Sequence, residues 1–244
     1  MSLSFKLDAK KTAVIFIEFQ NEFTSEGGKL YDAVKPSLEH FNTLENAAKL
    51  LKKARASRCK VIHCPISFEQ GHEEIGNRPY GILKGVKDGE AFTAGTWNAD
   101  FIDSMKPEKN EFIVKGKVGL DSFHNTNLDS ILRRNAVEEV VLCGFLANCC
   151  VESTMRTAYE NGYNVYTVKD ACAATSVEEQ DNCFEHNFGM FSVPTTTEET
   201  ISSIKVGGLL ANRNFGIYEK EATDDSTVVE FEVDANNTTE TQWA

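Results

Sequence analysis

The feature that most constrains the fold of this chain is a short apolar run near its beginning. Residues 12–17 have the sequence Thr-Ala-Val-Ile-Phe-Ile, which contains no charge and is rich in β-branched side chains. This pattern is typical of a strand that is covered on both faces, as strands are in a parallel sheet between two layers of helices. The run therefore predicts a central strand of an α/β fold.

Similar runs recur along the chain, and helical patterns separate most of them. Five further strands are expected at residues 60–66, 111–115, 139–143, 164–168 and 189–193. Between the first two strands, we expect Pro36 to open a long amphipathic helix that ends near Arg55. Strands that alternate with helices imply right-handed crossovers. We predict a three-layer α/β/α fold, doubly wound around a mostly parallel six-stranded sheet, which is Rossmann-like in architecture.

A chain of 244 residues is long enough to bury one substantial core. We predict one domain over residues 1–205 and a C-terminal extension over residues 206–244. The extension is acidic and rich in Thr and Asn, and residues 228–233 within it have the composition of one added strand. Residues 67–96 carry glycine and charge without clear periodicity, which is typical of a long functional loop.

The composition argues against several classes of function. The chain has 37 acidic and 25 basic residues, and a net charge of −12 repels nucleic acid and anionic membranes. No apolar run approaches the roughly 18 residues that a membrane span needs. The seven cysteines form no Cys-x-x-Cys pair and no secretion signal precedes Lys6, so we expect free thiols and a cytoplasmic location. Because no Gly-x-Gly-x-x-Gly or Walker loop is present, we expect no nucleotide cofactor.

One stretch combines a strand, a glycine turn and cysteines. Residues 142–154 pass from an apolar strand through Gly144 to Cys149 and Cys150, and a helical pattern follows. A thiol that opens a helix lies at the positive end of the helix dipole, which lowers its pKa, and nearby N–H groups can bind an oxyanion. The stretch predicts a nucleophile, although cysteine is also common as a small buried side chain.

Three polar residues fall at or just beyond the ends of predicted strands: Glu18 after the first, Lys115 after the third and Cys150 after the fourth. A parallel sheet brings the carboxyl ends of its strands to one edge, where α/β proteins bind ligands. We therefore expect these three residues to meet in one site.

Three blocks of the sequence resemble the isochorismatase-like cysteine hydrolases, in order and in spacing. Residues 16–23, Phe-Ile-Glu-Phe-Gln-Asn-Glu-Phe, are similar to the family's opening motif, apolar-apolar-Asp-x-Gln-Asn-Asp-Phe. Residues 114–116 with the Asp-Ser-Phe of residues 121–123 resemble its lysine segment, and residues 144–151 resemble its nucleophile segment. The resemblance spans residues from about 12 to 205.

The resemblance implies a Cys-Lys-acid triad in which Cys150 is the nucleophile, Lys115 the cation and Glu18 the general acid and base. It also implies a non-proline cis peptide between Phe145 and Leu146, and an oxyanion hole formed by the backbone N–H groups of Leu146 and Cys150. The implied activity is metal-independent hydrolysis of a small amide or ureido C–N bond through a thioester. With the apolar residues between 80 and 105, the resemblance also indicates a homo-oligomer.

Several alternatives remain at this point. Lys117 lies two residues from Lys115, and Cys149 is the rival thiol. Glu18 stands where the family has aspartate, so a catalytically silent binding or scaffold protein is an alternative. Vinyl ether hydrolysis, the namesake activity of the family, is another alternative, which a cationic pocket would favour.

The small-molecule substrate is expected to meet Phe23, Trp97 and Phe145. With Phe92 and Tyr80, such aromatic residues could instead belong to the core or to an oligomer interface. We expect no metal, because the Asp-x-His…His pattern of nicotinamidase-type members is missing and His72 has no nearby ligand partners in the sequence.

Overall fold

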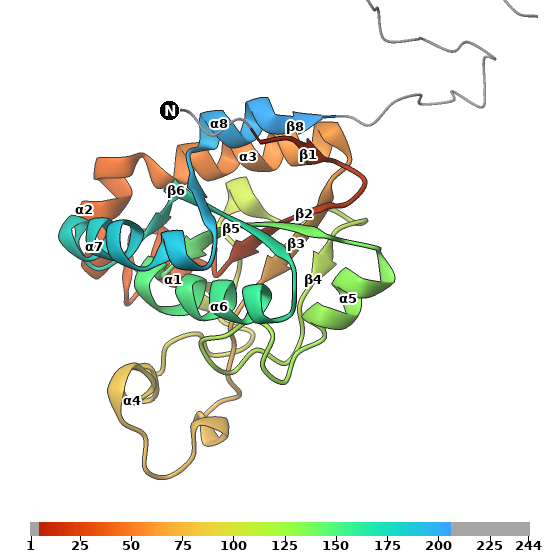
Figure 1. Cartoon of the computed structure of the whole chain (residues 1–244). Coiled ribbons are helices and arrows are strands. Elements are labelled where there is room, and N and C mark those ends of the chain that lie inside the picture. Colours follow the sequence, from red (N-terminus) through yellow and green to blue (C-terminus); the bar gives the residue numbers. More distant parts are fainter. Residues whose placement is uncertain (1–4, 206–244) are drawn as a thin grey trace, which may run out of the picture. The chain divides into compact units, whose positions relative to one another are not determined.

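The structure, a computed structural model, describes residues 5–205 and contains the predicted six-stranded parallel sheet (Figure 1). The strands lie in the order β4-β3-β2-β5-β6-β7, and every neighbouring pair is parallel. Their bounds are β2 Thr12–Ile17, β3 Lys60–Cys64, β4 Phe112–Ile113, β5 Glu139–Phe145, β6 Asn164–Ala173 and β7 Val193–Thr195. The short strands β1 (Leu7–Asp8) and β8 (Ile204–Lys205) pair in a separate parallel sheet. The predicted α/β class and six-stranded sheet are confirmed.

Helices cover both faces of the sheet. The α-helices are α1 Asn21–Thr24, α2 Tyr31–Phe41, α3 Thr43–Ser57, α4 Gly81–Asp88, α5 Leu128–Arg134, α6 Glu152–Glu160, α7 Val177–His186 and α8 Thr197–Ser203. In Figure 1, α3 and α8 lie on one side of the strands, and α5 and α6 lie on the other. Strand β2 is buried at all six positions because it pairs with β3 on one side and β5 on the other. The core therefore forms around the apolar run that the sequence predicts as central.

Five elements differ from the sequence prediction. The single helix expected from Pro36 to Arg55 is two helices, because Asn42 takes a left-handed conformation that ends α2 before α3 begins. The loop at residues 67–96 contains helix α4. Strands β3 and β4 are shorter than expected. The last strand is β7 rather than residues 189–193, since residues 188–190 form a 3-10 turn.

The predicted C-terminal extension, residues 206–244 with its added strand at 228–233, lies outside the described residues. Among residues 5–205, no helix is long and apolar enough to cross a membrane.

The strand order creates one special position at the carboxyl edge of the sheet. From β2 the chain proceeds to β3 on one side, whereas from β5 it proceeds to β6 on the other side. The crevice between the ends of β2 and β5 is therefore the topological switch point, where α/β sheets bind ligands. At this point Gly144 of β5 lies opposite Ile17 of β2 with φ of +129°. A Cβ on Gly144 would lie 2.0 Å from the carbonyl oxygen of Ile17, so only glycine allows the two strands to approach.

We predict that Gly144→Ala lowers the free energy of unfolding by at least about 3 kcal/mol, since it combines backbone strain with a backbone clash. Gly162→Ala is the matched control, because Gly162 also has positive φ, +84°, but a Cβ there meets nothing within 4 Å. The control is expected to lose only about 1 kcal/mol. Urea unfolding of both variants measures the difference, and equal losses would contradict the close approach of β2 and β5.

Candidate active site

Glu18 is the first residue after β2 and lies at the switch point. Its backbone is left-handed, with φ of +58°, and its N–H donates to the carbonyl oxygen of Cys64 at 3.1 Å. This conformation directs the chain away from the strand direction at the end of β2. The side chain of Glu18 is only 2% exposed, as the apolar sequence around it predicts.

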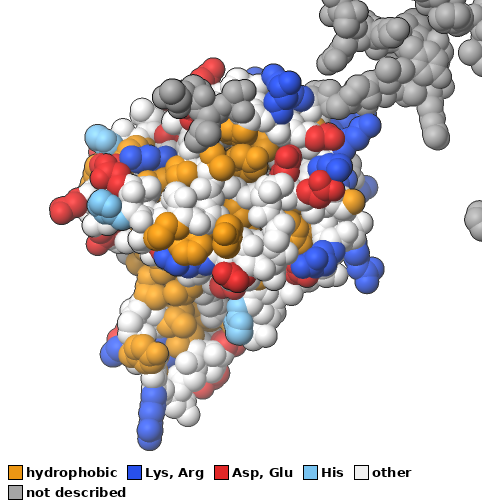
Figure 2. Space-filling view, viewed as in Figure 1, with side chains coloured by type: hydrophobic (Ala, Val, Ile, Leu, Met, Phe, Trp, Pro, Cys, Tyr) orange, Lys and Arg blue, Asp and Glu red, His pale blue; other side chains and the backbone are white. Residues whose placement is uncertain are grey.

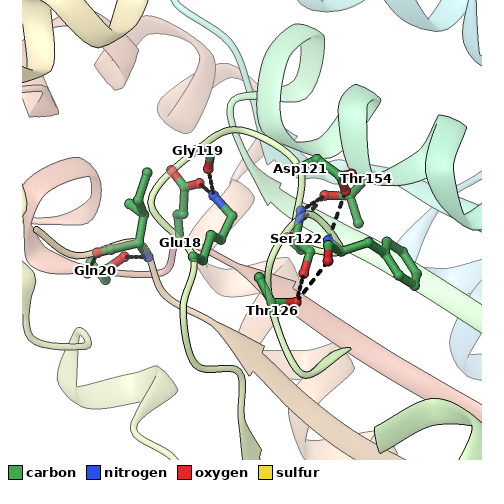
Figure 3. A network of polar contacts seen from close by, with 10 residues as sticks. Glu18, Gln20, Gly119, Asp121, Ser122, Thr126 and Thr154 are labelled. Atoms are coloured by element: carbon green, nitrogen blue, oxygen red, sulfur yellow. Dashed lines mark hydrogen bonds and ion pairs between the residues drawn. The ribbon is translucent and has the colours of Figure 1, made fainter. Parts of the chain in front are cut away.

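The cation that pairs with Glu18 is Lys117. The Nζ atom of Lys117 donates to Oε1 of Glu18 and, at 2.7 Å, to the carbonyl oxygen of Gly119 (Figure 3). Both members of this ion pair are almost fully buried. Burial lowers the pKa of Lys117, but the negative charges around it, above all Glu18, more than offset this and the pKa is raised overall. Lys117 is therefore charged in the folded protein.

The prediction that Lys115 pairs with Glu18 is wrong. Lys115 is exposed, and its backbone N–H donates to Oδ1 of Asn127 at 2.9 Å. The two lysines do not share one face because β4 ends at Ile113 and Gly116 takes φ of +90° between them. A Cβ on Gly116 would lie 2.7 Å from the carbonyl oxygen of Asn125, so the turn is tightly packed. The glycine between the lysines is the sequence signal that could have identified the turn.

A polar network holds the loop that carries Lys117. The N–H of Ser122 donates to Oγ1 of Thr154 at 3.0 Å, and the Thr154 hydroxyl donates to Oγ of Ser122 at 3.0 Å (Figure 3). The hydroxyl of Thr157 donates to Oδ2 of Asp121 at 2.9 Å. Thr154 and Thr157 belong to α6, so these bonds join the loop that carries Lys117 to the helix that follows Cys150. The Asp-Ser-Phe block thus has a positioning role.

Cys150 lies beyond β5 in one turn of π-helix, η4 (Ala147–Val151), which continues directly into α6. The peptide bond between Phe145 and Leu146 is cis. The expectation that Cys150 opens the helix is corrected, because the helical turn begins three residues earlier. Cys150 is buried, at 4% exposure, whereas Cys149 is half-buried.

The environment of Cys150 also differs from the sequence prediction. Its pKa is raised well above the ordinary value by the adjacent Cys149 thiol, by burial and by the charge of Glu18, while Lys117 acts in the opposite direction. A raised pKa disfavours the thiolate form of this side chain. A base close to it is therefore required before Cys150 can act as a nucleophile.

One cavity of about 280 Å³ contains both Glu18 and Cys150 in its wall. Leu146 and Phe23 also line it, so two further predicted site residues share this cavity with Cys150. The backbone N–H groups of Leu146 and Cys150 remain predicted oxyanion donors.

The other aromatic residues that the sequence analysis names differ in their position relative to this cavity. Phe145 is fully buried and stacks on Phe23 with ring centroids 5.2 Å apart, so it supports the cavity wall from behind. Trp97 is 51% exposed and Tyr80 is also exposed, and neither lines the cavity. Phe92 does line it. Trp97 and Phe145, which the sequence predicts as pocket residues, do not line this cavity.

Gln20 is a structural residue whose role the sequence analysis did not assign. It is fully buried, its Nε2 donates to the carbonyl oxygens of Ile66 and Ala99 at 2.8 and 2.7 Å, and its Oε1 accepts from the N–H of Ile66 at 2.9 Å. These bonds tie the segment after β2 to the segment after β3 and to the loop near residue 99. The Gln-Asn pair of the opening motif at residues 16–23 is the sequence signal that could have identified this role.

Histidine has no part in the described site. His72 is buried and its Nε2 lies 2.7 Å from the carbonyl oxygen of Ala91, which is a structural contact within the 67–96 loop. Among residues 5–205, no group of three or more His, Cys, Asp or Glu side chains has an arrangement that could hold a metal ion.

Comparisons with known proteins agree with this fold. The family model of the isochorismatase domain matches residues 12–199. Ureidoacrylate amidohydrolase RutB of Rhizobium rhizogenes is 29% identical over 68% of this chain and 71% of its own length. The isochorismatase family protein YddQ of Bacillus subtilis is 31% identical over 70% of this chain and 82% of its own length. The crystal structure of a cysteine hydrolase from Pseudomonas syringae pv. phaseolicola has a TM-score of 0.72 and 27% identity, over 83% of this chain and 98% of that one. The chain therefore belongs to the isochorismatase family of hydrolases.

Proposed function

We propose that this protein is a cysteine amidohydrolase that cleaves a small non-peptide amide or ureido C–N bond, with Cys150, Glu18 and Lys117 as its triad. The observation that carries the proposal is the buried Glu18–Lys117 ion pair, whose carboxylate shares one cavity with the Cys150 thiol. The similarity to a ureidoacrylate amidohydrolase and to a cysteine hydrolase supports the same reaction class.

In the proposed mechanism, Glu18 accepts the thiol proton while Sγ of Cys150 attacks the carbonyl carbon. The oxyanion of the tetrahedral intermediate receives hydrogen bonds from the N–H groups of Leu146 and Cys150. Glu18 then returns the proton to the nitrogen, the C–N bond breaks and a thioester remains. Water, deprotonated by Glu18, attacks the thioester to release the acid and restore the thiol. Because the pKa of Cys150 is raised, the first step of this mechanism needs a base such as Glu18.

Lys117 has an electrostatic role in this mechanism. Its charge holds the Glu18 carboxylate in position and lowers the pKa of Cys150 relative to the same site without the lysine. Because Lys117 is charged throughout, it stabilises the negative charge that moves between the thiol, the carboxylate and the oxyanion. It donates no proton to the substrate.

Vinyl ether hydrolysis is less well supported than amide hydrolysis. Isochorismate is a dicarboxylate, and a cationic pocket would favour it. The cavity that the described residues form has no lysine or arginine in its lining. The alternative of a catalytically silent protein differs from both hydrolases only in its lack of activity, so an activity measurement distinguishes it.

We predict that Cys150→Ala abolishes hydrolysis of carboxamides and ureides while leaving the unfolding transition nearly unchanged. Cys149→Ser is the matched control, since it alters the adjacent thiol, and it is expected to keep activity within about tenfold of the wild type. Release of ammonia measures both variants. If Cys149→Ser is the inactive variant, Cys150 is not the nucleophile.

We predict that Lys117→Met lowers kcat by at least about a hundredfold, because it removes the charge beside the thiol and the carboxylate. It also leaves the buried charge of Glu18 unpaired, which costs about 3–5 kcal/mol of stability. Lys115→Met is the matched control and is expected to change the free energy of unfolding by less than about 0.5 kcal/mol and to leave kcat unchanged.

The Glu18→Gln, Lys117→Met double variant separates the two effects of Lys117. With both charges removed, stability is expected to recover relative to Lys117→Met, whereas activity is not. Steady-state kinetics and urea unfolding of the wild type, Lys117→Met, Lys115→Met and the double variant provide the measurement. Loss of activity in Lys115→Met with retention in Lys117→Met would overturn this assignment.

We predict that Glu18→Asp lowers kcat by about a hundredfold, although aspartate is the residue that the family has at this position. The shorter side chain withdraws the carboxylate from the ion pair with Lys117 and from the thiol. Steady-state kinetics on the same amides measures the change. A rise in activity would indicate that glutamate at this position marks a decayed site.

A further inference from the structure

The cavity that Glu18 and Cys150 share is lined almost wholly by carbon. Besides these two side chains, Thr175 is the only polar side chain among the described residues in its lining, and the other lining residues are aliphatic, aromatic or glycine. An apolar cavity with few polar groups selects its ligand by shape and by the absence of charge.

The walls of the cavity come from separate parts of the chain. Leu30 and Val34 line it from the start of α2 and Phe92 from the segment that follows α4. Helix α4 contributes Leu83 and Val86, so the long loop predicted at residues 67–96 supplies one wall.

Helix α4 lies apart from the layered body of the domain in Figure 1, and hydrophobic side chains gather over the same region in Figure 2. Two lysines bond at its C-terminal end: Nζ of Lys87, in the last turn, donates to the carbonyl oxygen of Gly76 at 2.9 Å, and Nζ of Lys29 donates to that of Gly89, the residue after the helix, at 2.7 Å. These bonds fix the end of α4 that carries Val86, one of the residues that line the cavity.

The charges around the cavity disfavour an anionic ligand. Among residues 5–205, no lysine, arginine or histidine lines it, and the charge of Lys117 is already paired with Glu18. A carboxylate that entered would lose its hydration without gaining a cation and would also be repelled by Glu18. An uncharged group has neither cost.

We propose that the substrate is an uncharged carboxamide with an apolar acyl group, and that Leu83 and Val86 of α4 determine the size of that group. This proposal rests on the amidohydrolase function proposed above. An apolar cavity of about 150 Å³ binds benzene, so a cavity of about 280 Å³ can hold a branched aliphatic or aromatic acyl group together with its amide.

The reaction balances without a co-reactant other than water. Sγ of Cys150 bonds to the acyl carbon, and the C–N bond breaks as ammonia leaves with the proton that Glu18 returns. Water then cleaves the thioester, giving the carboxylic acid and the free thiol.

The test compares isocaproamide with succinamate, in which a carboxylate replaces the isopropyl group at nearly the same size. We expect kcat/KM for isocaproamide to exceed that for succinamate by at least about a hundredfold, since burial of the unpaired carboxylate is costly. Calorimetric binding of both compounds to Cys150→Ala gives a second measurement that does not need turnover, and the same order of affinity is expected.

Substitutions at two positions of α4 examine the wall directly. Leu83→Arg places a cation at the cavity and is expected to lower the preference for isocaproamide by at least about tenfold, whereas Leu83→Met, which keeps the size without charge, preserves it. Val86→Phe reduces the space and is expected to lower kcat/KM for isocaproamide more than for acetamide.

The outcomes separate this proposal from the proposed function. Hydrolysis of succinamate at an equal or higher rate than isocaproamide would overturn the substrate class and leave the amidohydrolase function standing. If neither compound is hydrolysed but Cys150→Ala binds isocaproamide selectively, the amidohydrolase function fails and the ligand class is supported. Equal binding of both compounds, or binding of neither, would overturn the ligand class.

Discussion

The buried ion pair between Glu18 and Lys117 is the interaction on which the site depends. Either charge alone would be strongly unfavourable in this interior, because burial removes its hydration. The pair is tolerable since Lys117 also donates to the carbonyl oxygen of Gly119, and the loop that carries it is bonded to α6 through Ser122 and Thr154. The end of β2, the loop after β4 and the helix after β5 are thereby held in one arrangement.

Most of the fold could be predicted because the relevant signals are local and repeated. The apolar run at residues 12–17 and its counterparts specify strands by composition, and their alternation with helices specifies parallel crossovers. The strand order then places Glu18 and Cys150 at the switch point. Two of the three proposed triad residues followed from this reasoning, since both adjoin strands of the central pair.

The remaining differences come from single residues that change the chain direction or from tertiary packing. Lys115 and Lys117 are equivalent in an extended strand, and only the left-handed turn at Gly116 makes Lys117 the buried lysine. Asn42 divides one helical pattern into two helices in the same way. Phe145 and Trp97 could not be assigned from the sequence, because whether an aromatic side chain lines a cavity, supports its wall or faces solvent depends on neighbours that are distant in the chain.

The apolar cavity and the ion pair act on each other. Charges interact more strongly where water is excluded, so the carbon-lined walls increase the effect of Lys117 on the thiol and on Glu18. The adjacent Cys149 thiol and burial by these walls both raise the pKa of Cys150. An anionic ligand in this cavity would be repelled by Glu18 and would find no cation in the lining that the described residues form. The arrangement that suits the proposed proton transfer between Cys150 and Glu18 therefore also favours the uncharged ligand that we propose, so the proposed reactivity and selectivity have the same physical origin.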